Sequence, residues 1–311
     1  MRALRILLGV SLVLAGTGLV LYGFSNSEEA GAQPYTRTVT NTVPLSATGA
    51  VHLENHEGTI QVRTWSRGEV QYEVQFVSET DEQAPHNADL RVVTGPESIR
   101  LRPDLDDLDR TWKINLQGIR RLDAISAVHI TVTVPARASL DIADHASDID
   151  LDGLGGALRL DTHEGSVSVR NHEGAVHIDA HDSPIRLDDI AGDVRLDLHD
   201  ADVRAEGIAG AVDVDAHEGD LDLHFAALRA PVDVETHDAD LVLRLPRNAS
   251  FDLFTNFSDD DADLDADFAL DSVRIQTGND EDEVDYRGAV NGGGPRIALR
   301  GHDPDVRLYT K

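Results

Sequence analysis

The sequence predicts an all-β protein, a right-handed parallel β-helix or flattened β-roll solenoid with coils of about 18 residues. Three observations predict this fold. A phrase recurs every 18 residues between Ser139 and Leu245, each copy contains two short stretches of alternating apolar residues, and turn residues separate these stretches. A fixed period of this size is typical of solenoids, in which each repeat packs on its neighbours. The right-handed sense is the general rule for parallel crossovers.

Each repeat is expected to hold two strands and two turns. In one copy, Val176 and Ile178 alternate before a histidine turn, and Ile185 and Leu187 alternate after it. Alternation with a period of two places such residues on one side of a strand. The second turn of each repeat carries glycine, which accepts a positive φ at little cost. Its copies are Leu154-Gly155-Gly156, His172-Glu173-Gly174, Ile190-Ala191-Gly192 and Ile208-Ala209-Gly210.

One solenoid is expected to occupy the chain after its N-terminal segment. The repeated phrase also occurs outside the regular block, from Val51 to Val62 and from Ile297 to Leu308. We therefore assign 33–138 to irregular first coils and 139–311 to the regular repeats and C-terminal coils. A charged insertion at about 104–121 interrupts the first part. It is expected to be a loop or a short helix.

Residues 1–32 predict a signal peptide or an N-terminal transmembrane anchor with a linker. Arg2 and Arg5 precede an apolar run from Ile6 to Phe24, a pattern that keeps the basic end in the cytoplasm and exports the residues after the run. The run is long enough to span a bilayer, whereas Ala30-Gly31-Ala32 resembles a cleavage site. Both alternatives stay open. The rest of the chain is expected to be periplasmic or on the cell surface, with membrane contact only through this segment.

Composition restricts the partners of the chain. The formal net charge is −30 at pH 7, and there is no cysteine. Phosphate binding requires the opposite sign of charge, so nucleic acid is not an expected partner. The absence of cysteine excludes disulfides and thiolate zinc sites. The acidic clusters keep a β protein soluble, or some of them hold Ca²⁺, which prefers oxygen ligands.

A histidine stands at one turn of every repeat, usually followed by an acid. A second acid usually stands two positions earlier, on the histidine's side of the strand. Stacking would place both residue types in parallel columns about 4.8 Å apart, a histidine ladder. The turn histidines are His56, His145, His163, His181, His199, His217 and His237. The earlier acids are Glu54, Asp161, Asp179, Asp197, Asp215 and Glu235.

Two interpretations of the ladder remain open. In the first, the histidines are turn residues, bonded to neighbouring carboxylates or to backbone. Because the equivalent positions of the other turn are apolar, the histidine rings could also be partly buried at the corners of the coil. Alternatively, imidazoles and carboxylates from adjacent coils bind a divalent transition metal. No other cofactor is expected. A ladder of this kind could also respond to pH, and self-association is expected near pH 5. The metal hypothesis names His163, His181, His199, His217, Asp179, Asp197 and Asp215.

An enzyme is not expected. The sequence has no Gly-x-Ser-x-Gly, no His-Glu-x-x-His and no phosphate-binding glycine loop, which are the motifs of common hydrolases and nucleotide enzymes. Its acids recur identically from coil to coil, whereas a catalytic site breaks such repetition. A β-helix that cleaves polysaccharides with paired carboxylates is the third alternative, after a binding module and a metal-binding or pH-responsive protein.

Several segments resemble the bacterial putative-adhesin family of β-strand repeat proteins. They are the phrase from Val51 to Trp65, the repeated turn-Gly-x-Val-x-Val pattern, the segment from Leu243 to Leu253 and Gly292-Gly293-Gly294-Pro295. The resemblance covers about 40–311. It implies an exported, non-catalytic, structural or binding β-helix of the cell envelope, whose partner is an unknown envelope or surface component. Members commonly carry Ser/Asn-Gly-Asp at the turns, so the histidine ladder departs from the family.

Overall fold

The computed structural model describes residues 33–105, 111–115, 118–122, 124–258, 263–268, 274–277, 284–302 and 305–310. The chain divides into two compact units, Met1–Gln33 and Pro34–Lys311. The expected signal peptide or anchor, 1–32, lies outside the described residues. Within the described ranges, we find no helix with the length and apolarity needed to cross a membrane.

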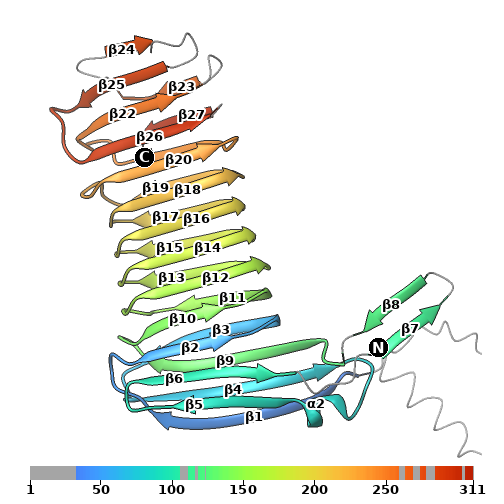
Figure 1. The fold of residues 1–311 in the computed structure, drawn as a ribbon. Helices are drawn as coiled ribbons and strands as arrows, with labels where there is room; N and C mark the ends of the chain where they lie inside the picture. Colours follow the sequence, from blue (N-terminus) through green and yellow to red (C-terminus); the bar gives the residue numbers. More distant parts are fainter. Residues whose placement is uncertain are drawn as a thin grey trace, which may run out of the picture. The chain divides into compact units, whose positions relative to one another are not determined.

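The unit Pro34–Lys311 is built from strands, and α2 (Ala84–Asn87) is the one helix among its described residues. Its central part is a stack of coils, each with two strands (Figure 1). One strand of every coil belongs to a first layer, which contains β2 (Ala50–Glu54), β10 (Ser139–Ala143), β12 (Leu158–Glu164), β14 (Val176–Asp182), β16 (Val194–Asp200), β18 (Val212–Glu218) and β20 (Val232–His237). The other belongs to a second layer, which contains β3 (Glu57–Trp65), β11 (Ala146–Asp152), β13 (Val167–His172), β15 (Ile185–Ile190), β17 (Val203–Ile208), β19 (Leu221–Phe225) and β21 (Leu241–Leu245).

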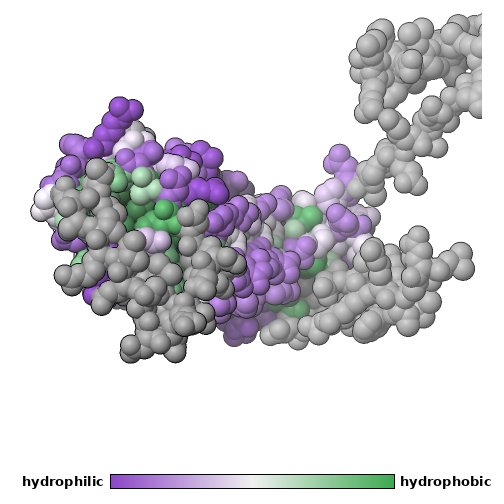
Figure 2. All heavy atoms as spheres, turned by 90° about the horizontal axis from the view of Figure 1, so that it is seen from above, coloured by the Kyte–Doolittle hydropathy of each residue, from purple (hydrophilic) through white to green (hydrophobic). Residues whose placement is uncertain are grey.

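Neighbouring strands of a layer run parallel, and equivalent residues of successive coils are direct partners. In the first layer, Ile178 pairs with Leu196 and Leu196 with Val214. The same side chains are buried, with 0%, 1% and 1% exposure. In the view of Figure 2, hydrophilic residues lie on the outside of the unit and hydrophobic residues lie further inside. The predicted parallel solenoid and its aliphatic columns are therefore confirmed.

Glycines allow the coils to nest at the second turn. A Cβ atom added to Gly192 would collide with the carbonyl group of Gly174, and one added to Gly210 would collide with that of Gly192. The backbone of one turn thus rests directly on the turn below. This close approach explains why the sequence repeats glycine there with the period of the coil.

The coils do not stack in sequence order at the start of the unit. The strand β2 lies between β10 and β6 (Ser98–Asp104), and β3 lies between β11 and β9 (Ala127–Pro135), all parallel. Antiparallel strands complete this end: β5 (Asp89–Thr94) pairs with β6, β4 (Glu69–Ser78) with β9, and β1 (Tyr35–Pro44) with β4.

The C-terminal strands are inserted into the stack. The strand β26 (Arg296–His302) runs parallel to both β20 and β22 (Phe251–Phe257), and β27 (Asp305–Thr310) runs parallel to both β21 and β23 (Asp263–Ala266). The strand β25 (Val284–Val290) then pairs antiparallel with β22 and with β24 (Arg274–Thr277). One solenoid therefore includes both outlying copies of the phrase, as expected, but the final copy is an internal coil.

The described residues of the charged insertion include two paired strands. Its strands, β7 (Thr111–Asn115) and β8 (Gly118–Leu122), pair antiparallel as a separate two-stranded sheet. The expectation of a loop or short helix at 104–121 was wrong for these strands. Threonine, tryptophan and isoleucine in β7 favour extended backbone, and this preference outweighs the charged residues around them.

Candidate functional site

Seven histidines lie one above another at the turn between the two layers. The ring centroids of successive histidines are 4.8, 5.3, 4.5, 5.4, 5.2 and 5.0 Å apart, from His56 to His237. An eighth, His302, is the strand partner of His237. The parallel register produces this column, because each histidine occupies the same position of its coil. The histidine ladder expected from the sequence is present.

The rings of the ladder do not share one orientation. The pairs His56/His145 and His163/His181 are stacked flat, with interplanar angles of 6° and 7°. His199 differs, since its ring is tilted by 42° from that of His181 and by 43° from that of His217. The middle of the ladder therefore has rings that do not stack face to face.

The ladder lies on the surface. Six of its seven stacked histidines are exposed, and His181 is half-buried. The residue before each histidine points inward instead: Thr162, Ala180 and Leu198 are at most 4% exposed. Alternation along the strand places these neighbours on opposite sides. The question of buried corners, left open by the sequence, is thus answered in favour of exposed rings.

A carboxylate column runs beside the middle of the ladder. Asp179 pairs with Asp197 and Asp197 with Asp215 in the first-layer register. Together with three histidines they line a shallow hollow of about 170 Å³, which we call the ladder hollow. Its lining residues are Asp179, Ala180, His181, Asp197, Leu198, His199, Asp215 and His217.

The structure brings together six of the seven residues that the sequence proposed as metal ligands. The seventh, His163, does not line the ladder hollow, and its ring lies flat on that of His181 at 4.5 Å. No three histidine, aspartate or glutamate side chains of the described ranges converge on a point where a metal ion would fit. The donors are therefore adjacent but not arranged around a common centre.

Asp197 is the most strongly engaged carboxylate of the hollow. Its Oδ2 is 2.9 Å from Nε2 of His177, and its Oδ1 accepts a hydrogen bond of 3.1 Å from Nη2 of Arg195. Partial burial raises the pKa of Asp197, but the hydrogen bonds from Arg195 and His177 outweigh it, so the pKa lies below its ordinary value. The carboxylate therefore remains ionised at neutral pH.

One histidine at the opposite turn is buried. His172 is 1% exposed and occupies the position that Leu154, Ile190 and Ile208 fill in other coils. Its Nε2 lies 3.4 Å from the carbonyl oxygen of Ala175, and its Nδ1 has no hydrogen-bond partner. Burial lowers the pKa of His172. This residue was not predicted from the sequence, although the apolar residues one period away would have placed it inside.

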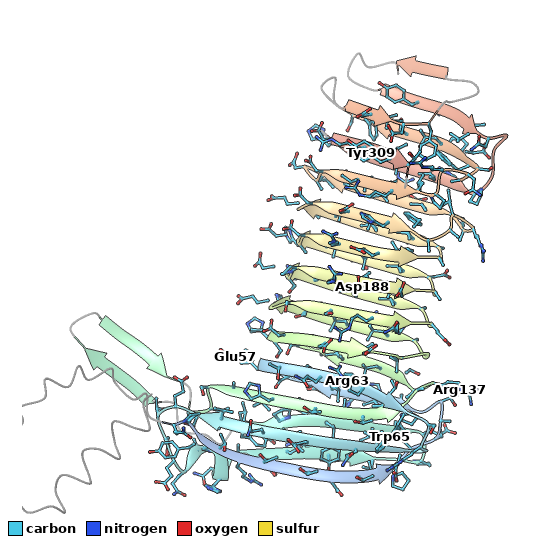
Figure 3. The ribbon with its side chains drawn as sticks, turned by 180° about the vertical axis from the view of Figure 1, so that it is seen from behind. Glu57, Arg63, Trp65, Arg137, Asp188 and Tyr309 are labelled. Carbon is cyan, nitrogen blue, oxygen red and sulfur yellow. The ribbon has the colours of Figure 1, made fainter. Side chains whose placement is uncertain are left out.

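The outer surface of the second layer is lined by ion pairs. Arg63 and Arg170 both bind Asp150, at 2.7 and 2.8 Å, and Arg186 binds Asp188 at 2.8 Å. Figure 3 shows this layer, with Arg63 and Asp188 pointing outward along it. Much of its charge is neutralised within the layer. The ladder side presents imidazoles beside a carboxylate column, in which Asp197 is likewise paired with Arg195.

Comparison with known proteins gives a family and several distant structural likenesses. The family model Toastrack DUF4097 matches residues 105–287. No curated protein matches the chain. A putative adhesin from Bacteroides fragilis NCTC 9343 is 10% identical, with 88% of this chain and 97% of that chain covered and a TM-score of 0.47.

Two further likenesses have lower TM-scores. A putative adhesin from Parabacteroides merdae ATCC 43184 is 7% identical, with 88% and 96% of the two chains covered and a TM-score of 0.36. A putative cell adhesion protein from Clostridium sporogenes ATCC 15579 is 9% identical, with 90% and 100% covered and a TM-score of 0.23. The family match covers more than half of the chain and includes every regular coil. The chain belongs to the Toastrack DUF4097 family.

Proposed function

We propose that the chain is a non-catalytic binding module of the cell envelope, and that it engages an envelope or surface component through the ladder side of its solenoid. One observation carries this proposal: a column of seven neighbouring histidines, six of them exposed, follows the coils from His56 to His237 without interruption. Identical exposed groups at a regular spacing suit a partner that is itself extended. A catalytic site would instead require one coil to differ from the rest.

The proposal includes export through the first 32 residues. Arg2 and Arg5 before the apolar run favour it, because positively charged residues stay on the cytoplasmic side. A reporter fused after Lys311 that is active only outside the cytoplasm is the expected result. Reporter activity in the cytoplasm with an intact chain would contradict the proposed location.

We also infer a right-handed coil, by the general rule for parallel crossovers.

Co-sedimentation with isolated bacterial envelopes tests the binding role. The purified full chain should sediment with envelopes, and a variant with His181→Ser, His199→Ser and His217→Ser should remain largely in the supernatant. The matched control replaces three histidines away from the ladder, His52, His86 and His129, with serine, and should sediment like the original chain. Equal sedimentation of both variants would show that the ladder is not the binding surface.

A further inference from the structure

We propose that the ladder hollow is a binding site for a divalent transition-metal ion, held by two adjacent imidazoles, that of His199 and that of either His181 or His217, with carboxylates of the aspartate column. This inference rests on the proposed binding function and names the ligand class of the same surface. Three adjacent coils contribute to the site, through β14, β16 and β18.

The geometry of the rings favours this part of the ladder. A zinc ion takes imidazole nitrogens at about 2.0–2.1 Å, so two ligand atoms of one ion lie roughly 3–3.5 Å apart. Flat-stacked rings keep their nitrogens a full rung apart. The ring of His199 is instead tilted by more than 40° from both of its neighbours, at centroid distances of 5.4 and 5.2 Å. A modest further rotation would turn nitrogens of two rings toward one point.

That rotation is available because the rings lie on the surface. His199 and His217 are exposed, and His181 is half-buried. Exposed side chains change rotamer without moving the core. The donors do not yet converge in the structure, so the ion itself is expected to draw them together. Asp179 and Asp215, on either side of Asp197, supply oxygen ligands or hydrogen-bond acceptors that orient the rings.

The combination of donors selects the ion. Ca²⁺ and Mg²⁺ prefer oxygen ligands only, whereas imidazole suits zinc, copper and nickel. The surrounding field also favours a cation, because the formal net charge is −30 at pH 7.

The ladder supplies its own control. His145 stands in the same column, but the positions two before and one after it are Ala143 and Ala146 rather than acids. Its ring lies flat against that of His56 but is turned by 60° from that of His163, so the difference from the hollow is the missing acids and not the ring tilt. A coil with the histidine but without acids at these two positions should bind metal poorly.

Calorimetric titration of the full chain with ZnCl₂ near pH 7.5 tests the site. The variant His181→Ala/His199→Ala should bind zinc at least about tenfold more weakly. The control His56→Ala/His145→Ala should stay within about twofold of the original chain. Asp179→Asn/Asp215→Asn should show an intermediate loss. Absence of zinc binding, or equal losses in the two histidine variants, would overturn the proposal.

A spectroscopic measurement separates imidazole ligation from general attraction to an acidic surface. With one equivalent of Cu²⁺, paramagnetic resonance of the chain should show nitrogen hyperfine structure, and His181→Ala/His199→Ala should lose it. Oxygen-only spectra would overturn the proposal. Sedimentation of the chain with envelopes distinguishes failure of the metal site from failure of the binding module. If the chain binds no zinc but still sediments with envelopes in the presence of a chelator, the metal site is refuted and the binding module stands.

Discussion

His172 and Ile190 are direct partners in the parallel pairing of β13 and β15. An imidazole therefore occupies a position that the next coil fills with a buried isoleucine. The ring is 1% exposed, and its Nδ1 has no hydrogen-bond partner. A buried polar atom without a partner costs about 1–3 kcal/mol. This coil is thus a weak point in an otherwise apolar column.

We expect the stability of the chain to depend on pH through His172. Burial lowers its folded-state pKa below the ordinary value of 6.5, although the Ala175 carbonyl and Glu173 oppose that shift. The unfolded chain then takes up more protons than the folded chain as pH falls below about 6.5, so His172 removes stability in that window. Thermal melts from pH 8 to pH 5 should show a smaller decline for His172→Leu than for the original chain.

Two comparisons make this measurement specific. At pH 7.5, His172→Leu should raise the free energy of unfolding by about 1–3 kcal/mol, because leucine already fills the position at Leu154 and no polar atom remains unpaired. Replacement of the exposed His86 with leucine should leave the pH dependence unchanged. A decline for His172→Leu as steep as that of the original chain would mean that the buried ring does not control acid stability.

The inward and outward sides of β14 predict opposite responses to substitution. Ile178 is 0% exposed, and Asp179, next to it, faces the surface. Ile178→Asp should lower the free energy of unfolding by more than about 4 kcal/mol, because it buries an unpaired charge. Asp179→Ser should cost less than about 1 kcal/mol. Urea melts measure both values, and similar losses in the two variants would contradict the register.

The sequence contained enough information for this register and for the ladder. An 18-residue period with alternation determines which residues share a column, so Ile178, Leu196 and Val214 could be aligned without coordinates. The period does not say which coil lies next to which at the ends of the stack. The insertion of β26 between β20 and β22 depends on pairing between segments far apart in sequence. Alternation does not encode such pairing.

The burial of His172 and the ring orientations in the ladder hollow were not predicted from the sequence, for different reasons. A polar residue is not expected inside the coil, so His172 was not assigned to the core, although the 18-residue period aligns it with buried apolar residues. For the hollow, the column of histidines was predictable, but its ring orientations were not. The difference between the flat pair His163/His181 and the tilted pair His181/His199 depends on side-chain rotamers. Repeat spacing contains no information about these rotamers.

Gly192 should tolerate no side chain. A Cβ atom at this position would collide with the carbonyl group of Gly174 in the coil below. Gly192→Ala should therefore separate the two turns and lower the free energy of unfolding by roughly 1–3 kcal/mol, as overpacking does. Gly292→Ala is the comparison, since nothing lies within 4 Å of its added Cβ atom. Its positive φ of 83° adds only conformational strain. A loss for Gly192→Ala no larger than for Gly292→Ala would refute close nesting of the coils.

The ladder should promote self-association in mild acid. Protonation of all 14 histidines would add one positive charge at each and change the formal net charge from −30 to −16. Histidine side chains in general take up protons near pH 6.5, and a smaller net charge weakens repulsion between copies. The exposed rings lie beside carboxylates of the first layer, so charged imidazoles of one copy can approach acids of another. Light scattering at low ionic strength should therefore show larger particles at pH 5 than at pH 8.

Replacement of the seven ladder histidines with glutamine tests whether the ladder is responsible. The variant can change its charge only from −30 to −23 by histidine protonation, since seven of the 14 histidines remain. It should associate less than the original chain at pH 5, and this difference should shrink in about 0.5 M salt, where the screening length is only a few ångströms. Thermal melts of the same samples separate association from unfolding. If the glutamine variant associates as much as the original chain, the exposed rings contribute nothing to contact between copies. The response to acid would then belong to other groups.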